Sequence, residues 1–245
     1  MSSKFFAIIT GAGAGTGRAV ALRFSKVYPV VLVAQRPELH KDTLSKITEA
    51  GGRAVGVTAD VTDSKSLALA FDTIKTELPD FKLAAAVYHA GFAFRVKPFL
   101  ECSPQILYSS FANVQGLFKF AQQTLPLLLQ SVPDSKYPPT LLIPGSASSI
   151  RAAAHNSILA VTMYARRALA QSLAREFHPK GVHVAHTIVD GTIDMPRSEG
   201  LTINGGVEDG KLNTEAVAEA YWYLHTQHRS AFTQELDLRP YVQKY

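Results

Sequence analysis

Residues 145–176, GSASSIRAAAHNSILAVTMYARRALAQSLARE, hold the strand end, loop and helix from which the rest of the fold can be worked out. They follow an apolar run, residues 140–144, which is typical of a buried strand. After a short polar loop, the Ala, Leu and Arg residues of 156–178 favour a long helix. The segment therefore predicts one strand-to-helix unit.

Short apolar runs alternate with helix-length amphipathic segments along the whole chain. Strands covered by helices on both faces are apolar throughout, so this pattern predicts βαβ units and a parallel sheet. We expect an α/β fold with seven parallel strands in a single domain, 1–245, because no linker, repeat or low-complexity tract divides the chain. The predicted strands are 5–10, 30–34, 54–58, 84–89, 140–144, 183–189 and 235–238. The predicted helices are 15–27, 38–50, 65–78, 104–130, 156–178 and 214–225.

Composition argues against several classes of protein. The 245 residues are 47% hydrophobic, and no apolar run approaches the roughly 20 residues of a membrane span. No signal peptide is recognisable, so we expect a cytoplasmic protein. The single Cys102 rules out an internal disulfide, and the eight His show no metal-ligand spacing. The net charge of +5 is scattered, which argues against nucleic-acid binding. Its densest cluster, Arg166, Arg167 and Arg175, is interpreted as a solvated helix face or a subunit contact.

Residues 192–211 form a polar, Gly-rich stretch between the sixth strand and the last helix. Structureless connections of this length are usually functional or mobile. We expect a lid over the substrate site.

A glycine-rich turn, TGAGAGTG, joins the first strand to the first helix at residues 10–17. Glycines allow a tight turn and close backbone approach, and a helix N-terminus offers free N–H groups to a pyrophosphate. The turn therefore predicts a dinucleotide site. The second strand ends in Ala34-Gln35-Arg36, without the carboxylate that would bind an adenosine ribose. Because Arg36 can pair with a 2′-phosphate, we expect NADP(H) in preference to NAD(H).

Several motifs together resemble the short-chain dehydrogenase/reductase family, over essentially the whole chain. They are the TGxxxGxG turn, Asp60-Val61, Ala90-Gly91, Asn113-Val114-Gln115-Gly116 and the helix ending ALAQSLARE. VDGTID at 189–194 and the C-terminal LDLRPY are similar to an offshoot named glucose/ribitol dehydrogenase-like. The resemblance implies a Rossmann-type, doubly wound sheet. It also implies cofactor contacts from Gly11, Gly15, Thr16, Gly17, Arg36, Asp60, Val61, Ala90, Gly91 and Ile193.

The resemblance further implies catalytic positions, of which only part are filled in the usual way. Ser146 corresponds to the Ser that positions the substrate carbonyl, and Asn113 to the Asn that holds a relay water. The same gap-free register places Leu159 at the position of the proton-donating Tyr and Met163 at that of the Lys. Tyr164 lies one residue past Met163, about 100° around the helix, so we expect it to point away from the cofactor.

Three functions remain open at this stage. The first is an atypical NADPH-dependent reductase of a small, apolar carbonyl or imine, with Asp190, His155 or Ser146 with water delivering any proton. Of these donors we favour Asp190, although a turn-forming role for it is a simpler reading. The second is a non-redox cyclase or isomerase acting mainly by orientation. The third is a catalytically silent NADP(H)-binding protein. The resemblance also implies a homodimer or homotetramer formed through the helices at 104–130 and 156–178.

Overall fold

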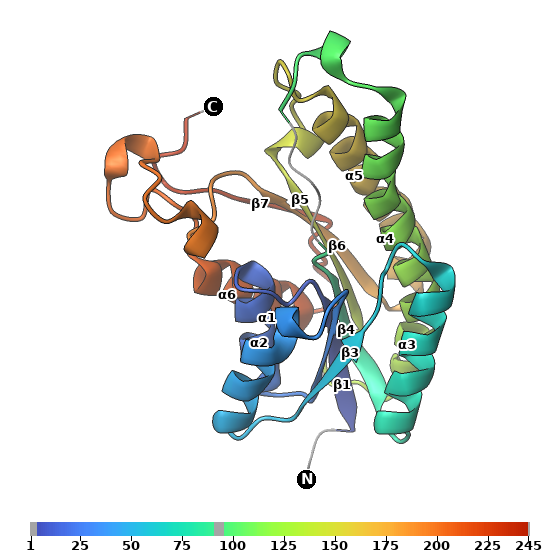
Figure 1. The fold of residues 1–245 in the computed structure, drawn as a ribbon. Coiled ribbons are helices and arrows are strands. Elements are labelled where there is room, and N and C mark those ends of the chain that lie inside the picture. The colour runs from blue at the N-terminus through green and yellow to red at the C-terminus, as the bar shows by residue number, and fades with distance from the viewer. Residues whose placement is uncertain (1–3, 91–95, 245) are drawn as a thin grey trace.

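The computed structural model describes residues 4–90 and 96–244. Seven parallel strands form one sheet in the order β3-β2-β1-β4-β5-β6-β7 (Figure 1). Their bounds are β1 Phe5–Thr10, β2 Val30–Ala34, β3 Ala54–Thr58, β4 Lys82–Tyr88, β5 Thr140–Ser146, β6 His183–Val189 and β7 Glu235–Leu238. The strand order reverses between β1 and β4, and ligands of open α/β sheets bind at the carboxyl ends of strands beside such a point.

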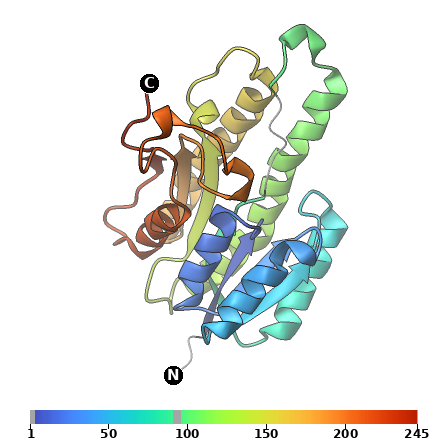
Figure 2. The ribbon, with the colours of Figure 1, turned by 60° about the vertical axis from the view of Figure 1, so that its left-hand side comes forward.

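Six α-helices cover the two faces of this sheet. They are α1 Thr16–Ser25, α2 Glu38–Glu49, α3 Ser64–Glu77, α4 Pro104–Ser131, α5 Ser157–Phe177 and α6 Thr214–Thr226. Helices α1, α2 and α6 lie on one face, and α3, α4 and α5 lie on the other (Figures 1 and 2). This arrangement confirms the predicted doubly wound α/β fold.

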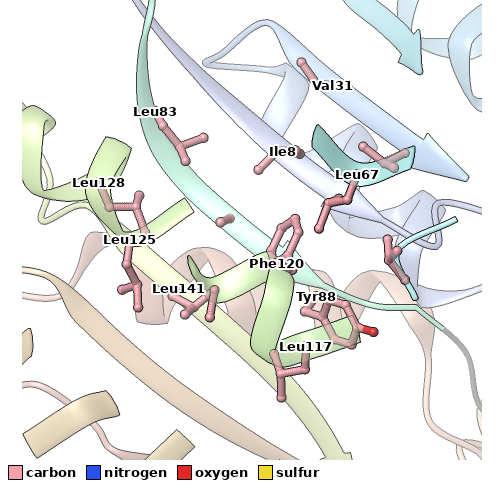
Figure 3. Close-up of a cluster of buried hydrophobic side chains, with 14 of the residues drawn as sticks. Ile8, Val31, Leu67, Leu83, Tyr88, Leu117, Phe120, Leu125, Leu128 and Leu141 are labelled. Carbon is pink, nitrogen blue, oxygen red and sulfur yellow. The ribbon is translucent and has the colours of Figure 1, made fainter. Parts of the chain in front are cut away.

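Each face of the sheet has its own apolar core, because alternate residues of every strand point to opposite sides. On the α4 face, Tyr88, Leu117 and Phe120 are fully buried with Ile8 and Leu141 (Figure 3). On the α1 face, the sheet packs against residues of α1 and α6. These two cores hold the carboxyl ends of β1, β4, β5 and β6 in fixed positions.

All the predicted boundaries agree with the structure to within two residues, and the strands that differ at all are β4 and β5. Strand β4 begins at Lys82, which pairs with Phe5, and it ends at Tyr88. His89 was predicted to end this strand, but it lies beyond it. Strand β5 continues to Ser146, which pairs with Val189, although the prediction ended it at residue 144. These strand ends are set by pairing with neighbouring strands. The apolar run of one strand does not reveal that pairing.

Residues 192–211 begin and end side by side. Ile193 bridges to Leu212, and the Leu212 amide donates to the Thr192 carbonyl over 2.8 Å. Two short 3-10 turns, Pro196–Ser198 and Asn204–Gly206, lie within the segment. The segment lies on the α1 and α6 side of the carboxyl edge, while the start of α4 lies on the other side (Figure 1). None of the helices within the described residues is long and apolar enough to cross a membrane.

Candidate functional site

The glycine turn after β1 is so tight that two of its glycines admit no side chain. A Cβ at Gly11 would stand 2.3 Å from the His89 carbonyl oxygen, and Gly11 has φ +68°. A Cβ at Gly17 would stand 2.3 Å from the Gly11 carbonyl oxygen. The start of α1 therefore packs directly on the turn, and the turn packs on the backbone that follows β4.

The N-terminus of α1 has free hydrogen-bonding capacity. No side chain caps it at Gly15, and its first turn contains no acidic residue. The Thr16 hydroxyl is buried, and no described residue hydrogen-bonds to it. An uncapped helix start with an unpartnered hydroxyl fits an anionic group such as a pyrophosphate.

Met195, from the 192–211 segment, lies over this helix start. Its Cε is 2.3 Å from the point where a Cβ of Gly15 would stand. The neighbouring Ile193 is fixed through its carbonyl, which accepts a hydrogen bond of 2.7 Å from the Ser198 hydroxyl. The segment predicted to be a lid thus contacts the predicted cofactor turn.

The carboxyl ends of β2 and β3 place Gln35 beside Asp60. The Asp60 carboxylate accepts hydrogen bonds from the amide and hydroxyl of Thr62 and from the Gln35 side chain. Burial acts to raise the pKa of Asp60, but these hydrogen bonds hold it below its ordinary value. Val61 is buried behind it. Arg36 is exposed, and within the described ranges no carboxylate forms an ion pair with it.

The end of β4 is held to its neighbours by the Tyr88 hydroxyl and the Ala90 backbone amide. The Tyr88 hydroxyl donates to the Asn113 carbonyl over 3.1 Å, in space left open by Gly116. The Ala90 amide donates to the Thr10 hydroxyl over 3.0 Å. These contacts tie β4 to α4 and to β1. The expected contact at Gly91 lies outside the described residues.

The end of β5 and the start of α5 bring Ser146, Leu159 and Met163 into one strand-to-helix unit. The Ser146 hydroxyl accepts a 3.3 Å hydrogen bond from the Ser148 amide. Leu159 and Met163 are buried, with 4% and 0% exposure, and α5 contains no lysine. Tyr164 is 41% exposed, in agreement with its place one residue around the helix.

Asp190, just beyond β6, lies between two guanidinium groups. Arg151 donates to both of its carboxylate oxygens over 2.9 and 2.7 Å, and Arg239 lies 3.1 Å away. The Asp190 side chain is only 3% exposed. These ion pairs connect the loop after β5, the turn after β6 and the C-terminal segment.

The prediction of a solvated arginine face on α5 is wrong for Arg166 and, in part, for Arg167. Arg166 is 2% exposed, because it lies on the helix face that carries Leu159 and Met163. Arg167 is partly buried and forms a two-pronged ion pair with Glu235. The helical spacing of residues 159, 163 and 166 was the signal that identifies Arg166.

Comparison with known proteins identifies the class. A Rossmann-type sheet with a glycine-rich, uncapped helix start is typical of dinucleotide-binding proteins. The chain belongs to the short-chain dehydrogenase/reductase family, since the family sequence model described as "Enoyl-(Acyl carrier protein) reductase" matches residues 11–235. It is thus an oxidoreductase of the short-chain type.

Individual relatives are similar over most of their length. An uncharacterized oxidoreductase of Staphylococcus epidermidis is 26% identical, with 96% of each chain covered. The 1-deoxy-11-beta-hydroxypentalenate dehydrogenase of Streptomyces exfoliatus is 28% identical over 88% of this chain and 78% of its own. The structure of a 3-ketoacyl-(acyl-carrier-protein) reductase from Brucella melitensis, complexed with NADH, superposes with a TM-score of 0.85 at 20% identity, covering 99% of both chains.

Proposed function

We propose that this protein is an atypical NADPH-dependent reductase that acts on a small, apolar carbonyl or imine. The observation that carries the proposal is the uncapped N-terminus of α1 with the unpartnered, buried Thr16 hydroxyl. Gly11, Gly15 and Gly17 would bring the backbone close to a pyrophosphate there. When bound, the nicotinamide cofactor supplies or accepts a hydride.

NADPH is favoured over NADH by the end of β2. Gln35 stands where a carboxylate would bind the ribose, and it is engaged with Asp60. Arg36 is the exposed cation beside it, available to a 2′-phosphate. Asp60 and Val61 would border the adenine, while Ala90 and Ile193 would border the nicotinamide half.

The proposed catalytic assignment keeps Ser146 and Asn113 and omits a tyrosine proton donor. Ser146 would hydrogen-bond the reacting oxygen or nitrogen of the substrate. Leu159 and Met163 occupy the Tyr and Lys positions and present only apolar groups and a thioether. Reduction of a cationic iminium needs no proton from the protein, which makes imines the favoured substrates.

Asp190 receives a different role from the one that we favoured on sequence alone. Both of its oxygens are engaged by Arg151, and Arg239 adds a second cation. We therefore propose that Asp190 holds the loops around the site together, and that water reaching Ser146 supplies any proton. Residues 192–211, through Met195, would close over the bound cofactor.

The test is NADPH oxidation with a cyclic iminium and with the ketone of the same ring. A reductase without a protein acid should turn over the iminium at least 100-fold faster than the ketone, since a general acid contributes about 10²- to 10⁴-fold. Equal rates with the two compounds would contradict the proposal that the protein has no proton donor. No oxidation with either compound, despite NADPH binding, would favour a non-redox enzyme or a silent NADP(H)-binding protein.

We also propose a homodimer or homotetramer formed through α4 and α5. The supporting observation is the set of exposed apolar side chains on these helices, Tyr108, Phe118, Val161 and Tyr164. Such patches mark association surfaces when they are contiguous. Light scattering on the purified protein tests this, and a monomer at micromolar concentration would contradict it.

A further inference from the structure

Arg166 is a buried cation with few partners. One Nη donates to the Tyr88 carbonyl over 3.3 Å, and the guanidinium carbon lies 5.3 Å from the centre of the Tyr88 ring. Its Nε is buried, and no described residue accepts a hydrogen bond from it. Buried charges are costly unless paired, so such a group is a candidate for a functional role.

No carboxylate balances this charge within the described part of the chain. The groups that interact electrostatically with Arg166 are two tyrosines and two histidines, namely Tyr88, Tyr221, His89 and His186. Desolvation, helped by the charge of Arg166, lowers the pKa of both His89 and His186 to about 4. Both imidazoles are therefore neutral at pH 7, and the phenols have no negative charge to offer. The region keeps a net positive charge.

The position of Arg166 relates this charge to the site. Arg166 follows Met163 by one turn on the same face of α5, and long helical side chains point back toward the helix N-terminus. Its hydrogen bond to Tyr88 brings the guanidinium to the carboxyl end of β4. The Tyr88 hydroxyl in turn donates to the Asn113 carbonyl, so Arg166, Tyr88 and Asn113 form one connected group at the carboxyl end of β4.

We propose that Arg166 is a positive charge built into the floor of the nicotinamide site, and that it makes the protein bind NADPH more tightly than NADP⁺. This inference rests on the proposed function, since it needs a bound nicotinamide. The oxidised ring carries a positive charge and the reduced ring is neutral. A buried cation below it therefore repels only the oxidised form. Arg166 would in this way place a cation of α5 below the nicotinamide, although this helix contains no lysine.

The experiment measures the ratio of the two dissociation constants, Kd(NADP⁺)/Kd(NADPH), by calorimetry. In the wild type this ratio should exceed one, and Arg166→Met should lower it roughly tenfold. Arg166→Lys, which keeps the charge, should retain most of it. Arg175→Met is the matched control, because it removes an exposed arginine of the same helix and should leave the ratio unchanged. Thermal melts establish that each variant is folded.

A structural role alone would change both dissociation constants together and leave their ratio intact. An unchanged ratio in folded Arg166→Met, or an equal shift in Arg175→Met, would overturn the inference. Should Arg166→Met fail to fold, Arg166→Gln, which keeps a donor but no charge, makes the same comparison. If the wild type binds neither nucleotide, the proposed function fails as well. If it binds both with no dependence on Arg166, only this inference fails.

Discussion

The β1–α1 half of the sheet and the β5–α5 half differ in what they retain of the family pattern. Around β1 the glycines are in place, and the fit of Gly11 against His89 and of Gly17 against Gly11 depends on backbone atoms. Around β5 the backbone is equally regular, and Ser146 pairs with Val189 in register. There, however, the side chains at 159 and 163 are apolar. On the proposed assignment, the nucleotide-binding turn, which is made of backbone, persists while the side-chain chemistry beside it changes.

Restoring the β5–α5 side chains should have the largest effect. The double change Leu159→Tyr with Met163→Lys should raise turnover of simple ketones by at least tenfold, because a positioned general acid contributes about 10²- to 10⁴-fold. Steady-state rates with NADPH provide the measurement. Leu159→Phe with Met163→Leu is the control, since it changes shape without adding a donor. If the ketone rate of the Tyr/Lys variant stays at the wild-type level, the assigned register is wrong.

Disrupting the glycine turn between β1 and α1 should have the next largest effect. Gly11→Ala should abolish nucleotide binding and lower the free energy of unfolding. The positive φ alone costs about 1–2 kcal/mol, and the contact with His89 adds to it. Urea unfolding measures this loss for Gly11→Ala and for the control Gly51→Ala, where φ is +78° but nothing lies within 4 Å of the new Cβ. Equal losses in the two variants would show that the close approach to β4 is unimportant.

Removing the proposed phosphate partner should change selectivity more than stability. Arg36→Ala should reduce the preference for NADPH over NADH about tenfold, the size expected for one charge-assisted hydrogen bond. Calorimetric titrations with both nucleotides provide the measurement, and Arg175→Ala controls for net charge. A preference unaffected by Arg36→Ala would remove the 2′-phosphate assignment.

The smallest effect concerns the outer edge of the β5–α5 half. Hydrogen bonds from Arg167, opposed by burial and helped by Gln171, lower the pKa of Glu235 from 4.5 to about 2. A carboxyl group whose pKa is lowered by folding stabilises the fold at pH values above its pKa in the unfolded chain. This contribution is lost as the pH falls toward its pKa in the folded protein. Glu235→Gln should therefore be less stable than the wild type at pH 7, by about 1 kcal/mol or less for so exposed a pair. Unfolding curves should converge between pH 4.5 and 2, and a constant difference would contradict the assignment.

The sequence was a good guide wherever structure follows from local pattern. The apolar runs predicted β1, β2, β3 and β6 at their observed bounds, because parallel strands covered on both faces are largely apolar. The glycine turn was recognisable because its backbone conformation requires glycine at particular positions. Contacts that cross the sheet were not predictable in this way. Asp190 meets Arg151 and Arg239 only after three distant segments come together.

Arg166 shows the other limit of sequence analysis. Charge favours an exposed position, whereas helical phase places residue 166 with Leu159 and Met163. Tertiary packing follows the helical phase, and the Tyr88 carbonyl and ring together with Tyr221 partly offset the cost of burying the guanidinium.

Calorimetric titration of the purified protein with NADPH and NADH tests the central claim most directly. That claim is that the glycine turn between β1 and α1 still holds a nucleotide beside an altered catalytic half. We predict micromolar or tighter binding of NADPH and weaker binding of NADH. No binding of either nucleotide would contradict the account, because the uncapped start of α1 would then have lost its ligand together with the catalytic side chains.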